Sequence, residues 1–439
     1  MIGAGRVLAH REPGLAVDLA VGRLLRAEAR RVHHPALRAA QLVELLEQSP
    51  RRRGQTHDAR VPKNGDVPHF SLMKRLVPPF VLVLTAILAV AYAYLAWRLT
   101  AGPAARLVLA VPFVLIWLLP VLYWFSDREG QGLGDELLHA AAYVAAGWLN
   151  FALLLTVARD VLLIASGWEI GAPWVVAGSF VALAVGAAAA LRGPRIRRVD
   201  IPIERLAPAL EGLRIVQITD LHVGPTIRRR YVERVVNMAN ALEPDLVALT
   251  GDIADGPLER LAPHVAPLAA LHPRGRVFYV PGNHEYYAGA ARWIEHFRAL
   301  GFRPLLNEHA TLELRGVRLL VGGVTDGAAR LMRGGEGPRP ELAAGHGEPA
   351  AFRLLLAHNP RLAPHAAPHG FDLQLSGHTH AGQFFPWTLA IHLVHAPHVA
   401  GLSRSGAMQV YVSAGTGTWG PPVRFGSEPE LTLIRLVRA

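Results

Sequence analysis

Four long apolar segments constrain the fold of this chain more than any other feature. They span residues 77–97, 107–125, 138–157 and 173–191, and each has about the 20 residues that a helix needs to cross a bilayer. A buried soluble bundle is the alternative, but helices that are apolar all round and this long are typical of membranes. Tryptophan and tyrosine lie mostly toward the segment ends, where an aromatic belt meets the headgroups: Trp97, Trp117, Tyr123, Trp124, Trp148, Trp168 and Trp174. We therefore expect about four transmembrane helices in a membrane region of residues 73–198.

Lysine and arginine predict the orientation of these helices. Lys74 and Arg75 precede the first segment, four arginines at 192–198 follow the last, and the connecting loops contain only four more arginines. By the positive-inside rule, an even number of spans places both flanks in the cytoplasm. We expect a multi-pass protein of the cell (inner) membrane with a cytoplasmic domain after residue 198, although a miscounted span would reverse the side. A cleaved signal peptide is less favoured for the first segment, because three further spans follow it.

Residues 1–72 form an Arg-rich N-terminal extension. It contains an amphipathic stretch at about residues 16–46 and a polar segment at 51–66. Two interpretations stay open. The segment is a cytoplasmic extension, partly disordered, or it is an artefact of an upstream start assignment, since Met73 is followed at once by Lys74-Arg75 and the first apolar segment.

Composition excludes several classes of protein. The chain has no cysteine, so disulfides, zinc fingers, iron–sulfur clusters and thiol catalysis are excluded, and nitrogen and oxygen must hold any metal. The net charge is +11, but residues 199–439 carry 23 Lys and Arg against 21 Asp and Glu. A nucleic-acid-binding domain normally carries its own basic surface. Nucleic acid is therefore a disfavoured partner.

Five stretches beyond residue 198 share one construction, an apolar run that ends abruptly in polar residues of metal-ligand type. They are residues 214–222, 246–255, 277–285, 353–360 and 371–383. Such runs, with helical stretches between several of them, predict buried strands of an α/β sheet whose carboxyl ends meet at one crevice. The residues delivered there are Asp220, His222, Asp252, Asn283, His358, His378 and His380.

These residue types have a shared chemistry. His378 and His380 alone are weak evidence in a chain with 21 histidines, and the four other clusters give the pair its weight. Imidazole and carboxylate suit Mn, Fe, Zn or Co, and a shared carboxylate can hold two cations about 3.5–4 Å apart. His392, His395 and His398 follow closely enough to line a substrate pocket, but their surroundings favour ordinary loop positions.

In order, the motifs are Asp-x-His, Gly-Asp-x-x-Asp, Gly-Asn-His-Glu, a later His and Gly-His-x-His. This series resembles the calcineurin-like metallophosphoesterase superfamily. The segment Ser376 to Gln383 and the tail at 415–430 resemble its bacterial membrane-associated branch. The resemblance covers residues 199–439 and implies an α/β fold, a two-sheet β-sandwich flanked by helices.

The resemblance also implies roles for individual residues. Two divalent metal ions, of Mn, Fe, Zn, Co or Mg, are implied. Asp252 would bridge them, with Asp220, His222 and His380 on one ion and Asn283, His358 and His378 on the other. His284 would be the general acid that protonates the leaving group. We expect Asp255 and Glu285 to orient the histidines from behind rather than to bind metal.

The predicted function is a membrane-anchored, dinuclear-metal phosphoester hydrolase. A phosphodiester or pyrophosphate is the favoured substrate, and its being lipid-linked is argued from the membrane region alone. A broad nucleotide phosphodiesterase or a phosphoprotein phosphatase is the alternative within the same class. A non-catalytic membrane sensor that binds a phosphorylated ligand is the alternative from another class, and the presence of His284 argues against it, since a binding module needs no acid.

Overall fold

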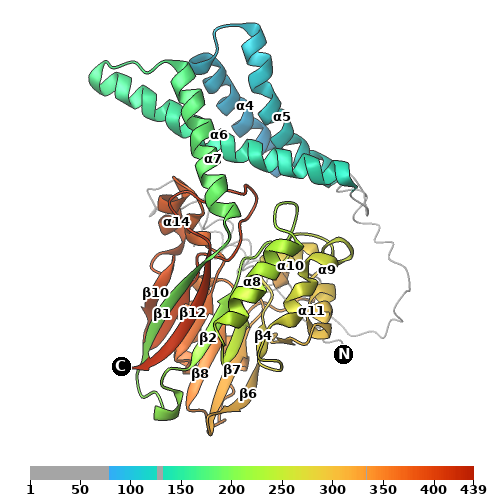
Figure 1. Ribbon diagram of the computed structural model, residues 1–439, viewed down its shortest axis with the longest axis vertical. Helices are drawn as coiled ribbons and strands as arrows, with labels where there is room; N and C mark the ends of the chain where they lie inside the picture. Colours follow the sequence, from blue (N-terminus) through green and yellow to red (C-terminus); the bar gives the residue numbers. More distant parts are fainter. Residues whose placement is uncertain (1–78, 126–131, 333) are drawn as a thin grey trace, which may run out of the picture. The chain divides into compact units, whose positions relative to one another are not determined.

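The computed structural model describes residues 79–125, 132–332 and 334–439. The expectations for residues 1–72 lie outside the described residues. The described part of each of the four apolar segments lies in a helix (Figure 1). The helices are α4 (Pro79–Leu99), α5 (Pro103–Phe125), α6 (Leu133–Ser166) and α7 (Ala172–Leu191).

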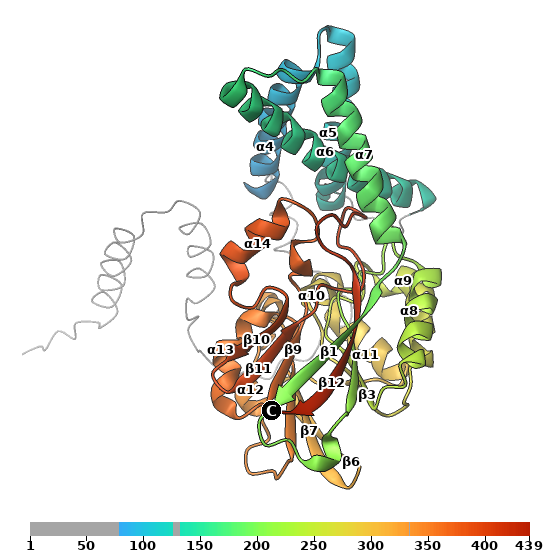
Figure 2. The same ribbon diagram turned by 60° about the vertical axis from the view of Figure 1, so that its left-hand side comes forward.

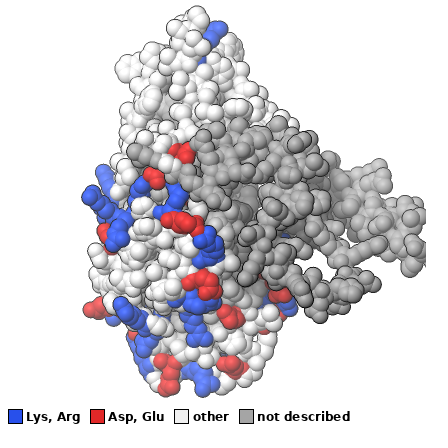
Figure 3. Space-filling view, turned by 90° about the vertical axis from the view of Figure 1, so that its right-hand side faces the viewer, with Lys and Arg blue, Asp and Glu red and all other residues white. Residues whose placement is uncertain are grey.

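Three of these helices are long and apolar enough to cross a membrane, over Val81–Leu99, Gly134–Ser166 and Ala172–Leu191. The apolar part of α5 that meets the same measure of hydropathy is shorter, Pro103–Leu119. The number of spans and the side on which the remaining chain lies therefore stay predictions. In Figure 3, charged side chains lie mostly on the part of the molecule below these helices, and the end formed by α4 to α7 carries very few.

Helix α6 has 34 residues, and at 1.5 Å per residue it is about 50 Å long. The sequence predicts a span of only residues 138–157. Toward its far end, Asp160 accepts hydrogen bonds from Tyr94 and Arg98 of α4, so a charge inside the apolar helix is paired. At its middle, Asn150 donates a hydrogen bond to the carbonyl of Phe385. Part of α6 thus packs on the domain that follows.

That domain contains two six-stranded sheets within the described residues, in the orders β1-β12-β2-β3-β4-β5 and β10-β11-β9-β8-β7-β6. The strands of the first sheet are β1 (Arg195–Ile203), β12 (Glu430–Arg438), β2 (Arg214–Ile218), β3 (Leu246–Leu249), β4 (Val277–Tyr279) and β5 (Arg303–Pro304). The strands of the second are β10 (Gly401–Ser405), β11 (Met408–Val412), β9 (Leu373–Ser376), β8 (Phe352–Leu356), β7 (Val317–Gly323) and β6 (Glu308–Leu314). All five strands predicted from the ligand-bearing stretches are present.

Strands β2 to β5 run parallel, and so do β7, β8, β9 and β11. The sheets face each other across an apolar core that includes Ile215, Phe278 and Leu354. Helices cover the outer faces (Figure 2). On the first sheet they are α8 (Arg229–Ala241), α9 (Leu258–Val265) and α11 (Ala290–Ala299), and on the second α12 (Pro340–Ala343) and α13 (Ala363–Ala366). The expected two-sheet sandwich flanked by helices is confirmed.

The boundary of the domain differs from the expectation by a few residues. The sequence analysis places residues 192–198 at the end of the membrane region, but β1 begins at Arg195 and pairs in parallel with β12. This is an edge strand, and the side chains of Arg195, Arg197 and Arg198 are exposed. Charge on an edge strand discourages pairing with other chains. Because of these arginines, β1 lacks the apolar run from which the other strands were predicted.

Candidate metal centre

The predicted ligands come from five strand ends. Asp220 and His222 follow β2, Asp252 follows β3, His358 follows β8, and His378 and His380 follow β9. Asn283 follows β4 and is the first residue of α10 (Asn283–Ala288). Because the carboxyl ends of parallel strands meet at one edge, the fold brings all seven side chains together. Most are buried, and Asn283 and His378 are partly accessible.

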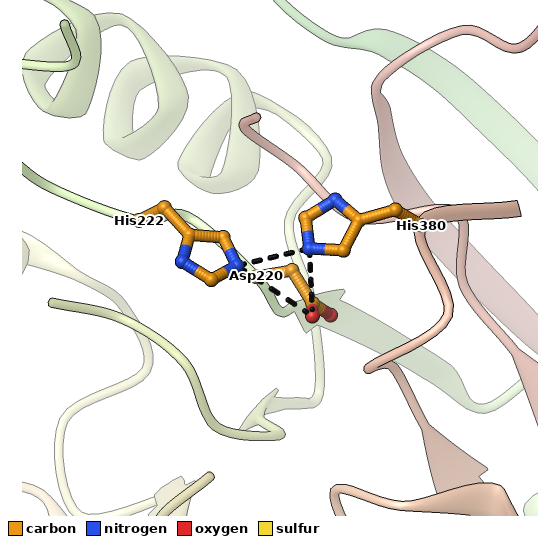
Figure 4. A group of neighbouring side chains, drawn as sticks. All are labelled: Asp220, His222 and His380. Atoms are coloured by element: carbon orange, nitrogen blue, oxygen red, sulfur yellow. Dashed lines mark hydrogen bonds and ion pairs between the residues drawn. The ribbon is translucent and has the colours of Figure 1, made fainter. Parts of the chain in front are cut away.

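The first group is Asp220, His222 and His380, whose side chains point toward one another (Figure 4). The Nε2 atoms of the two histidines are 2.9 Å apart. Asp220 Oδ1 lies 3.3 Å from His380 Nε2 and 3.9 Å from His222 Nε2. The Nδ1 of His222 bonds to Asp255 at 2.7 Å, so its Nε2 lone pair is free to face the centre of the group.

The second group is Asp252, His358 and His378, with the amide oxygen of Asn283 beside them. Asn283 Oδ1 is 3.2 Å from His358 Nε2 and 3.0 Å from His378 Nδ1. Asp252 Oδ2 is 3.0 Å from His358 Nε2 and 4.0 Å from His222 Nε2. Asp252 therefore lies between the two groups.

The donor set fits divalent cations. Ligands bound to one cation at about 2.0–2.2 Å lie about 3–3.5 Å from each other, and most of the separations above are in this range. Two imidazole nitrogens that face each other need a proton or a cation between them. All the donors are nitrogen or oxygen, which suits Mn, Fe, Zn or Co.

The backbone at the site is held in a conformation that side chains rarely adopt. Five of the predicted ligand residues have positive φ: Asp220 (51°), His222 (50°), Asp252 (52°), His378 (72°) and His380 (50°). Each such residue costs about 1–3 kcal/mol, and such strain clusters at functional sites. The strain points the side chains inward from short loops.

Two glycines allow the loops to approach closely. A Cβ at Gly377 would lie 2.0 Å from Asp220 Oδ2, and a Cβ at Gly282 would lie 2.1 Å from Asp252 Oδ1. No side chain fits at either position. Gly377 and Gly282 therefore serve the packing of the carboxylates, which explains why glycine precedes two of the motifs.

Electrostatics favour neutral imidazole at two positions and positive charge at the centre. Burial lowers the pKa of His378 to about 3 and that of His380 to about 4, as a metal-binding nitrogen requires. Burial alone would raise the pKa values of Asp220 and Asp252, but the surrounding histidines hold both well below the ordinary range. Burial opposes a charge on His358, yet Asp252 holds its pKa well above the ordinary value. The cluster thus stabilises a cation at its centre.

His284 lies beside the two groups and is more accessible than most of the predicted ligands. Its Nδ1 is 2.9 Å from Asp255 Oδ1, and its Nε2 is 4.0 Å from Asp252 Oδ2. Burial disfavours its charged form, but the hydrogen bond to Asp255 and the charge of Asp252 raise its pKa to about 9. The hydrogen bond to Asp255 thus favours the protonated form of the ring and orients it.

Asp255 and Glu285 both act behind the ligands, but in different ways. Asp255 accepts hydrogen bonds from His222 and His284. Within the described residues, the hydrogen bonds of Glu285 come from backbone groups and not from a histidine ring, which differs from the expectation. Its buried carboxylate accepts from the backbone N–H groups of Asp252, Ile253, Ala254 and Gly282. Glu285 fixes the loop that carries Asp252, because four charge-assisted bonds restrain that backbone.

Sequence reasoning did not assign a role to Arg424, which is almost completely buried. Its guanidinium donates to the carbonyls of His380 at 2.9 Å and Gly417 at 2.6 Å. Arg424 thus joins the loop of His380 to the carboxyl-terminal segment that contains Gly417. His395, for which the sequence favoured an ordinary loop position, lies in a helix, and its ring is 5.4 Å from that of His378. The sequence offered one signal for Arg424, which is a lone arginine among the glycines and prolines of residues 415–430.

The fold and its clustered donors define a protein of the metallophosphoesterase class. The chain belongs to the calcineurin-like metallophosphoesterase family. The family described as calcineurin-like phosphoesterase matches residues 213–382. An uncharacterized metallophosphoesterase of Aquifex aeolicus is 32% identical over 261 residues, which cover 58% of this chain and 98% of that protein. The resemblance inferred from the motifs is confirmed, and with it a metal-dependent phosphoesterase domain.

Two relatives are named as transmembrane proteins. The transmembrane protein with metallophosphoesterase domain of Danio rerio is 38% identical over 284 residues, covering 60% of this chain and 65% of that protein. The protein of the same name in Bos taurus is 37% identical over 266 residues, covering 58% and 60%. The chain therefore spans slightly less than two thirds of the length of these two relatives.

Proposed function

We propose that this chain is a membrane-anchored phosphoester hydrolase with two metal ions, acting on a phosphodiester or pyrophosphate that is lipid-linked. The observation that carries the proposal is the convergence of seven donors beside His284, whose Nδ1 lies 2.9 Å from Asp255 Oδ1. Bound cations would draw in the phosphate oxygens and lower the pKa of water at the site. We assign Asp220, His222 and His380 to one ion, Asn283, His358 and His378 to the other, and Asp252 to both.

Residues around the proposed metal ligands would donate a proton and hold the ligand loops in place. Asp255 holds the Nδ1 side of His284, which leaves Nε2 to donate a proton to the departing oxygen. Glu285 keeps the Asp252 loop in place, and Arg424 keeps the His380 loop in place. A sensor that only binds a phosphorylated ligand would have no use for a proton donor next to the ligand cluster.

A cavity of about 450 Å³ adjoins His284 and supports a large leaving group. The catalytic domain lines it with Tyr287 and Trp419, and helix α6 lines it with His139 and Tyr143. Glu136 of α6 forms salt bridges with Arg228 at 2.6 Å and with Arg260 at 3.3 Å. A helix with membrane character therefore forms part of the wall on the leaving-group side, which is our reason for favouring a lipid-linked substrate.

The test is hydrolysis by the full chain in lipid nanodiscs. Phosphomonoesters, soluble diesters, nucleotide diesters, phosphopeptides and lipid-linked pyrophosphates are compared with Mn, Mg, Zn, Fe or Co. We expect kcat/KM for a lipid-linked diester or pyrophosphate to exceed that of its soluble analogue at least about tenfold, the effect of about 1.4 kcal/mol of added binding. Preference for nucleotides or phosphopeptides would favour the alternative enzymes. Tight phosphate binding by the metal-loaded chain without turnover would favour a sensor.

The proposed topology is tested independently of activity. With four spans and a cytoplasmic catalytic domain, a reporter fused after Ala439 should function only as a cytoplasmic reporter. A tag inserted between Arg98 and Arg106, which lie at the α4–α5 connection, should be labelled from outside intact cells. A carboxyl-terminal fusion that functions only in the exported compartment would contradict the four-span topology.

A further inference from the structure

Helix α14 (Trp387–His395) exposes an unusual amount of apolar surface. The exposed fractions are 55% for Trp387, 64% for Leu389, 87% for Leu393 and 54% for Val394. The helix contains no Asp, Glu, Lys or Arg. At 100° per residue, these four side chains and Ile391 cover more than half of its circumference. The opposite face, which includes the buried His395, packs on the protein.

This helix is joined to the membrane helices by specific contacts. Asn150 of α6 donates to the carbonyl of Phe385, and its Oδ1 accepts from the indole N–H of Trp387 at 3.2 Å. The ring of Phe151 in α6 lies 6.5 Å from that of Phe384, just before α14. Figures 1 and 2 both show α14 at the end of the catalytic domain where helices α6 and α7 reach it. Its exposed face is thus continuous with the apolar surface of helices that cross a membrane.

We propose that α14 lies in the membrane interface, with Leu389, Leu393 and Trp387 in the boundary between headgroups and acyl chains. With nine residues, α14 is too short to cross a bilayer. An apolar face that begins with tryptophan suits the boundary between headgroups and acyl chains, where this residue is enriched. A contiguous exposed apolar patch on a soluble surface needs another occupant. Here the continuity with α6 identifies that occupant as the bilayer in which α6 sits.

The position of α14 has a consequence for the site. His395, on its buried face, has its ring 5.4 Å from that of His378, a predicted ligand. One side of this helix therefore contacts lipid and the other side contacts the metal centre. A phosphate group at the membrane surface would meet the site next to α14, whichever substrate the enzyme hydrolyses.

The absence of cysteine allows a direct test in the full chain. Leu393→Cys, and Leu389→Cys as a second site, are labelled with an environment-sensitive fluorophore in vesicles of phosphatidylethanolamine and phosphatidylglycerol. Leu342→Cys on α12 is the matched control, since Leu342 is also an exposed leucine of the catalytic domain, at 47%, on a helix away from α4 to α7 (Figure 2). Val185→Cys on α7 gives the value for a lipid-embedded site.

We expect the labels at Leu389 and Leu393 to emit at shorter wavelength than the label at Leu342. Quenchers attached to lipid acyl chains should quench them, and aqueous iodide should lose most of its effect on them. Bound metal equal to that of the unlabelled chain verifies folding. Iodide quenching at both sites equal to that at Leu342 would overturn the proposal. Protection in detergent that rises with protein concentration would also overturn it, because a second copy of the chain would then cover the face.

Discussion

Asp252→Asn is expected to reduce kcat at least about 10³-fold and to lower the content of both metal ions. Asp252 lies between the two donor groups, with its Oδ2 atom 3.0 Å from His358 Nε2 and 4.0 Å from His222 Nε2. The amide keeps the shape of the side chain but removes its negative charge. A loss of about 4 kcal/mol of charge stabilisation corresponds to this factor. Metal analysis and turnover of a nitrophenyl diester measure the two effects.

Two comparisons make this prediction specific. His380→Ala removes a donor from one group only, so it should cost less bound metal than Asp252→Asn. Asp326→Asn is the matched control, because Asp326 is also a buried aspartate, bonded to the N–H of Ala328, and is outside the proposed ligand set. Equal loss of both metals in Asp252→Asn and His380→Ala, with native circular dichroism, would count against a bridging role.

The sequence predicted the strand ends because their signal is local. An apolar run such as residues 214–218 followed by Asp220 and His222 needs no knowledge of distant residues. Parallel strands then bring such ends together as a geometric necessity. The same argument failed for β1, because its first residues include exposed arginines and form no apolar run. It also failed for the length of α6, since the pairing of Asp160 with Arg98, 62 residues away, cannot be seen in a hydropathy pattern.

The partners of buried charges were the hardest features to predict. Glu285 was expected to orient a histidine, but its partners are backbone N–H groups, among them that of Asp252, which has positive φ. Arg424 is buried against carbonyl groups from two separate loops. Such contacts depend on the exact path of the backbone and not on residue type. The apolar residues of α14 were visible in the sequence, but only the structure reveals that they are exposed.

His284→Ala tests the proton-transfer step. His284 faces the cavity and is held by Asp255 through Nδ1, so we propose that its Nε2 protonates the leaving oxygen. An alkoxide needs that proton in the transition state, whereas a nitrophenolate can depart without it. The variant should therefore lose about 10²–10⁴-fold in kcat on an alkyl diester and far less on a nitrophenyl diester. Its content of both metals should stay unchanged.

Metal content distinguishes a proton donor from a ligand, and the pattern of loss across the two substrates distinguishes a proton donor from a phosphate-binding group. His284 can be grouped geometrically with His222 and Asp252, so a metal-binding role is the competing hypothesis. His139→Ala is the matched control, because this histidine of α6 lines the same cavity; a change of cavity size alone would slow both diesters by a similar, small factor. Loss of metal from His284→Ala would make His284 a ligand. Equal slowing of the two diesters with full metal content would make it a phosphate-binding group, since a proton donor must matter more for the leaving group that cannot depart as an anion.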